Sequence, residues 1–439
     1  MPPLSAGGEL VVITRASPTT FYTDAQGNPA GLEFDLTNLF AQQLGVKLRL
    51  VTVRDFSRTI PALLAHRGHL AATGLTITAE RQMQVVFSAP YQTIQQQVVY
   101  QTDLPRPKTI ADLIGKKISV VAGSSHAEML RTLTQQNTGL RWNEKNVEDG
   151  EVLLAEVAES AIDYTVADSN LVEVVKNYYP NIEAAFNLGQ PQQLAWAFPK
   201  DAEPWLIERA NHFLNSVMQD GTLKRLLDRY YGHLQRLNQN DVAEFLDKRQ
   251  AVLPSYRALF QAAQEASGID WRLIAALGYQ ESHWNPLATS PTGVRGLMML
   301  TLDTAQRMKV SDRLDPQQNI PAGARYLAEL KSALPERLQE PDRTWMALAA
   351  YNVGSGHLED ARILAQQRKL DPDSWLDLKK TLPLLSRKQF YSALKHGYAR
   401  GGEPVIFVDN VRTYYDILVK YEAPHAAVDA ELSTKAYVP

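Results

Sequence analysis

Apolar positions follow two different patterns along the chain. From Leu10 to about Leu234, short apolar runs alternate with amphipathic stretches, and this alternation is typical of an α/β unit. The runs predict strands over 10–14, 46–51, 117–121 and 164–167. Residues 34–45 predict a helix that ends at Gly45, because glycine readily adopts the left-handed conformation that follows many helices. We therefore expect the first half to be an α/β domain.

The second half is predominantly helical. Residues 235–252 are polar and helical with a break at 238–241, and Pro254 begins a longer helical region whose last helix is expected over 408–418. A chain of 439 residues is also too long for one ordinary domain. We expect a multidomain chain: a disordered tail over 1–8, an α/β domain over 9–234, a linker over 235–253, a mainly α domain over 254–422 and a tail over 423–439.

One carboxylate lies at the end of an apolar helical face. The run over 271–280 predicts a helix that begins after Asp270, which is a favourable N-cap residue. Leu273, Leu277 and Glu281 are spaced four residues apart, so the carboxylate shares a face with apolar side chains. Burial there would raise the pKa of Glu281 and keep it protonated near neutral pH, as a general acid requires. The alternative is a surface carboxylate in the last turn of a helix, since buried glutamates are uncommon.

The residues that follow favour the catalytic interpretation. Glu281-Ser282 is followed by a turn at 290–293, by Gly-Leu-Met at 296–298 and by Ala-Tyr-Asn at 350–352. This set, in this order, resembles the lysozyme-like catalytic domain of the lytic transglycosylases. The resemblance implies a single catalytic acid/base, Glu281, and a group of residues that contact or line the saccharide site: Ser290, Met298, Tyr351 and Asn352.

Two positions qualify this resemblance. Tyr326 falls in a helix that the family shares, where it is expected to pack rather than to take part in the chemistry. Met299 stands where most members carry glutamine, so the saccharide contact of that amide does not transfer to this chain.

Glu281 has no partner carboxylate with a motif of its own, although most glycoside hydrolases use two. Three other carboxylates are near in sequence, and each has a structural explanation. Glu265 is expected on a helix surface, Asp270 at an N-cap and Asp303 at the start of a helix. A lone acid suits a substrate-assisted route. The resemblance implies cleavage of the MurNAc–GlcNAc bond with closure of a 1,6-anhydro ring. The spacing of residues does not exclude water as the nucleophile, in which case the protein would be a lysozyme-like hydrolase.

Several phrases of the first half resemble the polar amino-acid type of periplasmic solute-binding proteins. They lie at 31–36, 75–81, 87–91, 112–117 and 121–125. The resemblance implies two lobes joined by crossings near 97–104 and 187–194, with the last helices returning to the first lobe. It also implies a regulatory site for an amino acid or a murein stem peptide, in which Arg81 binds a carboxylate, Asp168 binds an ammonium group, and Thr76 and Ser125 support the ligand.

Composition argues against several other functions. The net charge is −3, so nothing indicates a nucleic-acid partner. The chain has no cysteine and its nine histidines show no metal-ligand spacing, so we expect neither a metal nor a cofactor. No run of 18 apolar residues is present, and the first residues lack the apolar region of a signal peptide, so the targeting segment of an exported protein would be absent from this chain.

A solute-binding domain joined to a cell-wall-cleaving domain is the arrangement of a membrane-bound branch of the lytic transglycosylases. The resemblance implies a periplasmic lyase that acts on peptidoglycan glycan strands and is held peripherally at the outer membrane. A different hypothesis is a solute receptor whose C-terminal domain only binds peptidoglycan. The intact set of site residues around Glu281 argues against it.

Overall fold

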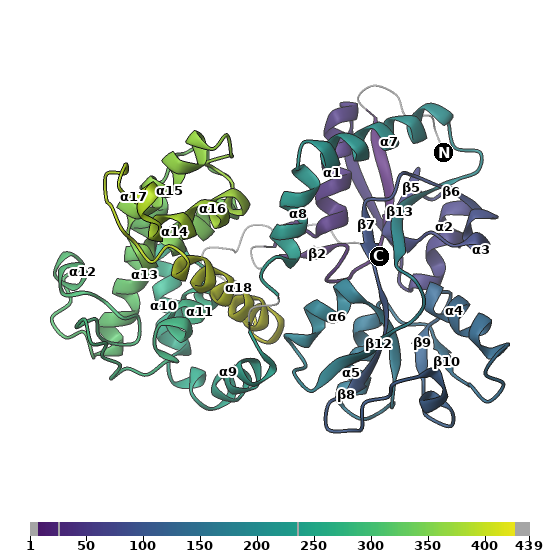
Figure 1. The fold of residues 1–439 in the computed structure, drawn as a ribbon, viewed down its shortest axis with the longest axis horizontal. Coiled ribbons are helices and arrows are strands. Elements are labelled where there is room, and N and C mark those ends of the chain that lie inside the picture. Colours follow the sequence, from purple (N-terminus) through teal and green to yellow (C-terminus); the bar gives the residue numbers. More distant parts are fainter. Residues whose placement is uncertain (1–7, 25–26, 235–236, 426–439) are drawn as a thin grey trace, which may run out of the picture. The chain divides into compact units, whose positions relative to one another are not determined.

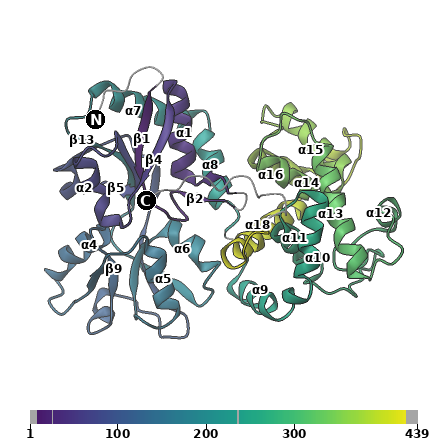
Figure 2. The same ribbon diagram turned by 180° about the vertical axis from the view of Figure 1, so that it is seen from behind.

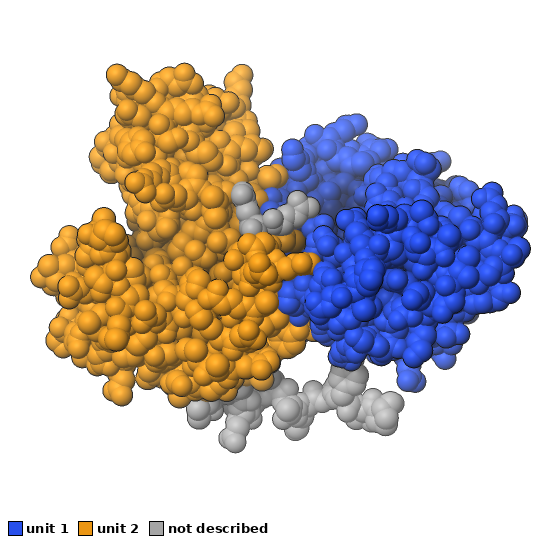
Figure 3. All heavy atoms as spheres, turned by 60° about the horizontal axis from the view of Figure 1, so that its bottom comes forward, with its two compact units in different colours: residues 1–232 blue, residues 233–439 orange. Residues whose placement is uncertain are grey.

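The computed structural model describes residues 8–24, 27–234 and 237–425. The chain forms two compact units, Met1–Gly232 and His233–Pro439 (Figure 3). The first is α/β and the second is helical, so the expected fold class is confirmed.

The first lobe of the first unit is built around a sheet with the strand order β4-β1-β5-β13-β6, and β7 also pairs with β13. Strands β4, β1 and β5 run parallel, whereas β13 runs antiparallel to β5, β6 and β7. The strands are β1 (Glu9–Thr14), β4 (Lys47–Thr52), β5 (Leu70–Thr76), β6 (Val85–Phe87), β7 (Gln92–Ile94) and β13 (Gln192–Pro199). The helices are α1 (Leu32–Leu44), α2 (Thr59–Leu64), α3 (Ala79–Gln82), α7 (Pro204–Gln219) and α8 (Thr222–Tyr231).

Local sequence explains much of this lobe. Alternating apolar residues of β1 and β5 meet α1, α7 and α8 in one core, which includes Leu10, Phe40 and Trp196. Helix α1 ends at Gly45, whose φ of 67° is left-handed, as the sequence predicts. Helices α7 and α8 return to this lobe, also as expected, because their apolar faces complete its core.

The second lobe contains a three-stranded antiparallel sheet, β11-β8-β12, and a parallel pair, β9 and β10. In Figure 1 it lies below the first lobe within the same unit. Its strands are β8 (Gln96–Gln101), β9 (Ser119–Val121), β10 (Asn143–Lys145), β11 (Thr165–Asp168) and β12 (Ile182–Asn187), and its helices are α4 (Ser125–Thr134), α5 (Gly150–Ala158) and α6 (Ser169–Lys176).

Two short connections join the lobes. One lies between the end of β7 at Ile94 and the start of β8 at Gln96, and the other between Asn187 and Gln192. The first connection therefore comes earlier than the expected 97–104. The reason is that Val98 and Val99 already belong to the second lobe, where both are fully buried.

The second unit consists of packed helices: α9 (Gln239–Ala251), α10 (Arg257–Ser267), α11 (Trp271–Ser282), α12 (Leu302–Arg307), α13 (Pro316–Ser332), α14 (Asp342–Val353), α15 (Ser355–Gln367), α16 (Trp375–Thr381), α17 (Lys388–Tyr391) and α18 (Glu403–Tyr421). Helix α11 packs against α10 and α18, and α10 and α14 both pack on α13. Figure 2 shows α10, α11 and α13 side by side. In the part of the chain that the structure describes, no helix is both long and apolar enough to cross a bilayer.

Helix α9 occupies most of the segment expected to be a linker. Its Phe245 is fully buried against Tyr279 of α11 and Tyr414 of α18, with ring centroids 4.6 Å away in both cases. Trp284 joins the same aromatic cluster, 5.5 Å from Phe245. One buried aromatic residue thus makes an otherwise polar helix part of the second unit.

Candidate functional site

Helix α11 places Glu281 in its last turn. The helix begins as predicted, because the Asp270 carboxylate accepts a hydrogen bond from the backbone of Arg272. It ends where His283 and Trp284 adopt left-handed conformations, with φ values of 52° and 58°. The Trp284 indole donates to the Ala275 carbonyl oxygen at 2.8 Å, which fixes this unusual helix end.

Glu281 is a partly exposed carboxylate that protein atoms nevertheless surround closely. Desolvation raises its pKa to about 8. Within the described residues, no hydrogen bond or ion pair holds the Glu281 carboxylate. The Tyr351 phenol lies near enough for the Glu281 charge to help raise the pKa of that phenol well above its usual value, after burial as the main cause. Glu281 is therefore protonated near neutral pH, which suits proton donation.

The segment after the 290–293 turn packs against the helix of Glu281. Ser282 donates to the Leu297 carbonyl oxygen at 2.8 Å, and the Met298 amide donates to Asn319 of α13 at 2.7 Å. Tyr351 of α14 donates through its hydroxyl to the Met298 carbonyl oxygen, also at 2.8 Å. These bonds bring the Gly-Leu-Met and Ala-Tyr-Asn motifs together beside α11, although they are about fifty residues apart in sequence.

Glycines allow this close packing. A Cβ on Gly323 would lie 2.7 Å from the Met298 side chain, and a Cβ on Gly278 would lie 2.7 Å from Leu297. Gly296 has a φ of 83°, and a Cβ there would lie 1.9 Å from the Arg313 carbonyl oxygen. Both the left-handed conformation and the lack of space require glycine at position 296.

The Met298 side chain has a different position from the one expected. It is fully buried between α11 and α13 and does not line an open groove. The small residues Gly278 and Gly323 draw it into the core. Met298 instead contributes its backbone carbonyl, which orients Tyr351.

The other expected sugar-site residues lie at the surface of this region. Ser290 is half-buried; its hydroxyl accepts the Val294 amide at 3.2 Å and lies 2.9 Å from the Thr292 hydroxyl. Asn352 is exposed beside Tyr351 at the end of α14. Ser290 thus stabilises its own turn in the structure.

The three nearby carboxylates have the structural roles expected of them. Glu265 lies 2.9 Å from the His425 ring nitrogen, Asp270 caps α11, and Asp303 is in the first turn of α12. The structure thus gives each of them a role other than that of a partner for Glu281.

Sequence reasoning missed one contributor to the site, Asn319, and anticipated the packing of another, Tyr326. Asn319 is a fully buried amide that also donates to the Arg313 carbonyl oxygen, at 2.9 Å. Tyr326 packs on Tyr351 with ring centroids 5.2 Å apart, and the Arg307 guanidinium lies 5.0 Å from the Tyr326 ring. A buried asparagine in a helix gives no spacing signal, whereas Tyr326 is in a recognisable motif and packs as the resemblance implies.

The four residues expected to bind a ligand lie where the two lobes of the first unit meet. Arg81 is 3% exposed, and its Nε lies 3.1 Å from the Glu128 carboxylate. Its other nitrogens donate to the carbonyl oxygens of Thr76 and Gly123, each at 3.0 Å. The Ser125 hydroxyl donates to the Thr76 hydroxyl at 3.1 Å. These contacts connect the two lobes.

Asp168 lies at the end of β11 and is 21% exposed at its side chain. One of its oxygens is 2.9 Å from the His126 ring nitrogen. It also lines a pocket together with Asn170, Arg15, Gln92, Thr19 and Gly74. Of the four expected residues, Asp168 is therefore the one that the pocket exposes.

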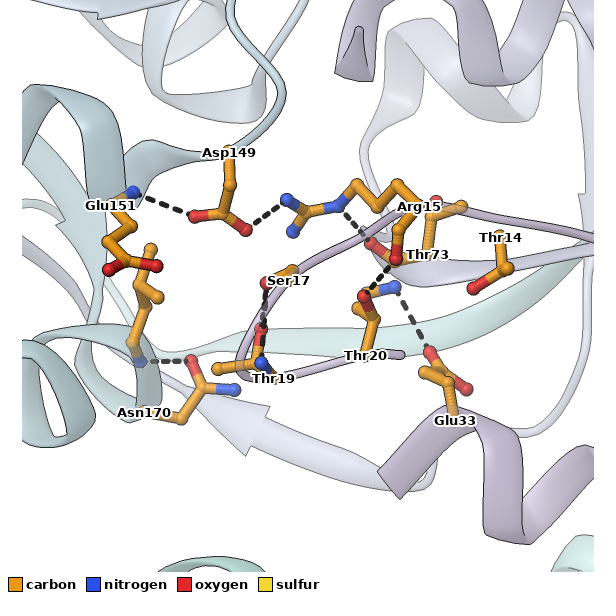
Figure 4. A network of polar contacts seen from close by, with 12 residues as sticks. Thr14, Arg15, Ser17, Thr19, Thr20, Glu33, Thr73, Asp149, Glu151 and Asn170 are labelled. Carbon is orange, nitrogen blue, oxygen red and sulfur yellow. Dashed lines mark hydrogen bonds and ion pairs between the residues drawn. The ribbon is translucent and has the colours of Figure 1, made fainter. Parts of the chain in front are cut away.

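A second interlobe ion pair joins Arg15 to Asp149 (Figure 4). Asp149 also caps α5 by accepting the Glu151 amide at 2.7 Å. Nearby, the buried Glu33 accepts hydrogen bonds from Gly74, Tyr91 and Trp196, and its burial raises its pKa. No cluster of three or more metal-ligating side chains occurs in the described ranges 8–24, 27–234 and 237–425.

Comparisons with known proteins match both units. The family model of bacterial extracellular solute-binding proteins, family 3, matches residues 10–233, and that of the transglycosylase SLT domain matches residues 258–373. The membrane-bound lytic murein transglycosylase F of Methylobacillus flagellatus is 50% identical over 423 residues, which cover 96% of this chain and 90% of that protein. The relative of the same name from Nitrosospira multiformis is 53% identical over 424 residues, covering 97% and 88%.

The chain belongs to the membrane-bound lytic murein transglycosylase F family. The expected enzyme class, a lytic murein transglycosylase, is thereby confirmed. Solved structures similar to the first part of the chain include a mutant arginine-binding protein from T. maritima, at 27% identity and a TM-score of 0.47, covering 51% of this chain and 95% of that one. Another is an ancestral arginine-binding protein bound to arginine, at 26% identity and a TM-score of 0.48, covering 52% and 100%.

Proposed function

We propose that this member of the transglycosylase F family cleaves the β-1,4 bond between MurNAc and GlcNAc in murein glycan strands and leaves a 1,6-anhydro-MurNAc end. The observation that carries the proposal is the isolated Glu281, whose pKa is raised to about 8 by desolvation. One group that holds a proton near neutral pH and has no partner carboxylate can serve first as an acid and then as a base.

The proposed reaction uses one proton in two steps. Glu281 donates its proton to the glycosidic oxygen as the bond from that oxygen to C1 of MurNAc breaks. The acetamido oxygen of the sugar stabilises the positive charge at C1. The Glu281 carboxylate then accepts the proton of the O6 hydroxyl while O6 bonds to C1. No water is consumed, and Glu281 ends in its starting state.

The sugar is positioned by groups around this carboxylate. Ser290 and Asn352 offer hydrogen-bonding side chains at the surface, and Tyr351 is held by the Met298 carbonyl oxygen. Met298 contributes to substrate binding through this support, since its side chain is buried. The next residue, Met299, is half-buried with a φ of 47°. Because it is not a glutamine, it offers no side-chain amide to the sugar.

Product analysis tests the route. Purified sacculi are digested with the full chain, and the ends of the released muropeptides are identified by mass. Anhydro ends are expected. Ends that carry one more water would show hydrolysis, the lysozyme-like alternative, while leaving Glu281 as the acid.

We also propose that the cleft of the first unit binds an amino acid or a murein stem peptide that modulates cleavage. Support comes from Asp168, which lines a pocket between the lobes, and from Thr76, Arg81 and Ser125, whose contacts hold the lobes together beside it. The two connections between the lobes allow them to move apart. Regulation requires that the ligand bind open and closed lobes with different affinity. Turnover of sacculi with and without saturating ligand tests it, and an unchanged rate would contradict it.

The proposed location is the periplasm, at the periphery of the outer membrane, where murein is accessible. The family name, membrane-bound, supports this placement. Fractionation of cells that express the natural protein, followed by salt and carbonate washes, tests whether it associates peripherally. Recovery in the cytoplasmic fraction would contradict the proposal.

A further inference from the structure

Two arginines of the first lobe face the second lobe, and their surroundings differ. Arg81 is enclosed: Glu128 neutralises it at 3.1 Å, and two backbone carbonyls accept hydrogen bonds from its other nitrogens. The Phe56 ring does not distinguish the two arginines, since the Arg81 and Arg15 guanidinium groups lie 5.6 Å and 5.2 Å from its centre. A ligand carboxylate could reach this cation only by displacing Glu128. The displaced carboxylate, 15% exposed, would then lack its partner, which is costly for a buried charge.

Arg15 lines the pocket instead. Its Nε donates to the Thr73 carbonyl oxygen at 3.0 Å, and Nη1 pairs with Asp149. Figure 4 shows the interactions of Nε and Nη1, and among the described residues Nη2 has no hydrogen-bond or ion-pair partner. An arginine with a remaining nitrogen can receive a carboxylate without giving up both of its present partners.

The opposite side of the pocket carries complementary groups. Asp168 and Asn170 of the second lobe line it, and His126 contacts one Asp168 oxygen. A cation on one lobe and a carboxylate with an amide on the other suit a small molecule that carries both an anionic and a cationic group. The free space is about 20 Å³, the room of roughly one water molecule, so the lobes must separate to admit such a ligand.

We propose that Arg15, rather than Arg81, receives the carboxylate of a zwitterionic ligand in this cleft, while Asp168 receives its ammonium group. Arg81 and Glu128 form a structural ion pair that fastens the lobes. The proposal rests on the proposed ligand-binding function of the first unit and specifies how that site recognises its ligand.

Two substitutions at one ion pair separate a binding role from a purely structural one. Arg15→Met and Asp149→Asn both remove the Arg15–Asp149 pair, and asparagine keeps the ability to cap α5. If Arg15 only fastens the lobes, the two variants have the same effect on ligand affinity. If Arg15 binds the ligand, Arg15→Met weakens binding and Asp149→Asn, which frees the guanidinium, does not.

The experiment is calorimetric titration of the full chain with L-glutamate, L-arginine and the dipeptide L-alanyl-D-glutamate. For each probe that the wild type binds, we expect Arg15→Met to weaken binding about tenfold or more, the loss typical of a charge-assisted hydrogen bond. Asp149→Asn should bind within about threefold of the wild type or more tightly. Arg58→Met removes a charge at an exposed position of the same lobe, 69% exposed at its side chain, and should leave affinity unchanged.

Each outcome of the titrations either supports or overturns the assignment of Arg15 as the carboxylate-binding residue. Equal weakening in Arg15→Met and Asp149→Asn, or no weakening in Arg15→Met, would overturn the assignment while leaving ligand binding intact. Failure of the wild type to bind any probe at millimolar concentration would overturn the proposed ligand-binding function and this assignment with it. Arg15→Lys keeps the positive charge but loses the planar guanidinium and its paired donors. It controls for misfolding of Arg15→Met and should show an intermediate loss of ligand affinity.

Discussion

Glu281 in the second unit and Arg81 in the first are both ionisable groups that protein atoms surround closely, but their neighbours give them opposite properties. Glu281 has no counter-charge, so desolvation alone raises its pKa to about 8. Burial lowers the pKa of Arg81, but Glu128 and two carbonyl groups favour its charged form. A desolvated group without a partner is suited to proton transfer, whereas a partnered one holds parts of the structure together.

The largest expected effect comes from removing the carboxyl proton of Glu281. Glu281→Gln keeps the shape of the side chain but cannot donate a proton, so turnover of sacculi should fall by roughly two to four orders of magnitude. Release of soluble muropeptides measures it. Glu265→Gln is the matched control, since this carboxylate is 50% exposed and should leave turnover near the wild-type rate. Retention of more than about a tenth of the activity in Glu281→Gln would remove the catalytic assignment.

Breaking the ion pair between Arg81 and Glu128 should mainly affect the stability of the first unit. Arg81→Met leaves Glu128 without its counter-ion and should lower the free energy of unfolding of the first unit by about 3–5 kcal/mol. The double variant Arg81→Met/Glu128→Gln should recover part of that loss. Chemical denaturation measures both, and Arg49→Met, in the exposed pair with Glu9, should cost less than about 1 kcal/mol. An Arg81→Met variant as stable as this control would show that Arg81 does not fasten the lobes.

The pH dependence of stability should distinguish Glu281 from an ordinary glutamate. Its pKa is about 8 in the folded chain and near 4.5 for a free side chain. Between these values the folded state keeps a proton that the unfolded state has lost, so the stability of the second unit falls as pH rises, by at most about 1.4 kcal/mol per pH unit. Denaturation monitored by tryptophan fluorescence should show this slope in the wild type and a weaker one in Glu281→Gln. Identical slopes would mean that the Glu281 pKa is not raised. Cleavage should likewise decline above about pH 8, where the acid is lost.

The smallest effect is expected at Ser290. Ser290→Ala removes a hydroxyl that holds the 290–294 turn, a loss of about 1 kcal/mol or roughly fivefold in turnover. Ser386→Ala, which also removes a hydroxyl bonded to the backbone, serves as the control and should leave turnover unchanged. A loss as large as that of Glu281→Gln would indicate a direct part in the chemistry.

Local sequence signals predicted individual elements well and their surroundings less well. The N-cap at Asp270, the end of α1 at Gly45 and the position of Glu281 in the last turn of α11 all follow from neighbouring residues. The first lobe connection was expected too late, because an apolar run alone does not show which lobe buries it. A polar helix such as α9 gives no sign that one residue, Phe245, will pack into the aromatic cluster.

Residue order and local periodicity are enough to predict the two-unit composition of the chain, the motifs of the catalytic region and the isolation of Glu281 from other motif-bearing carboxylates. How the charged and buried groups are used depends instead on the folded arrangement. It buried Met298 against Gly278 and Gly323, and it paired Arg81 with Glu128 while leaving Arg15 beside the pocket. Partners far apart in sequence set desolvation and ion pairing, and these long-range contacts carry no signal that one sequence reveals.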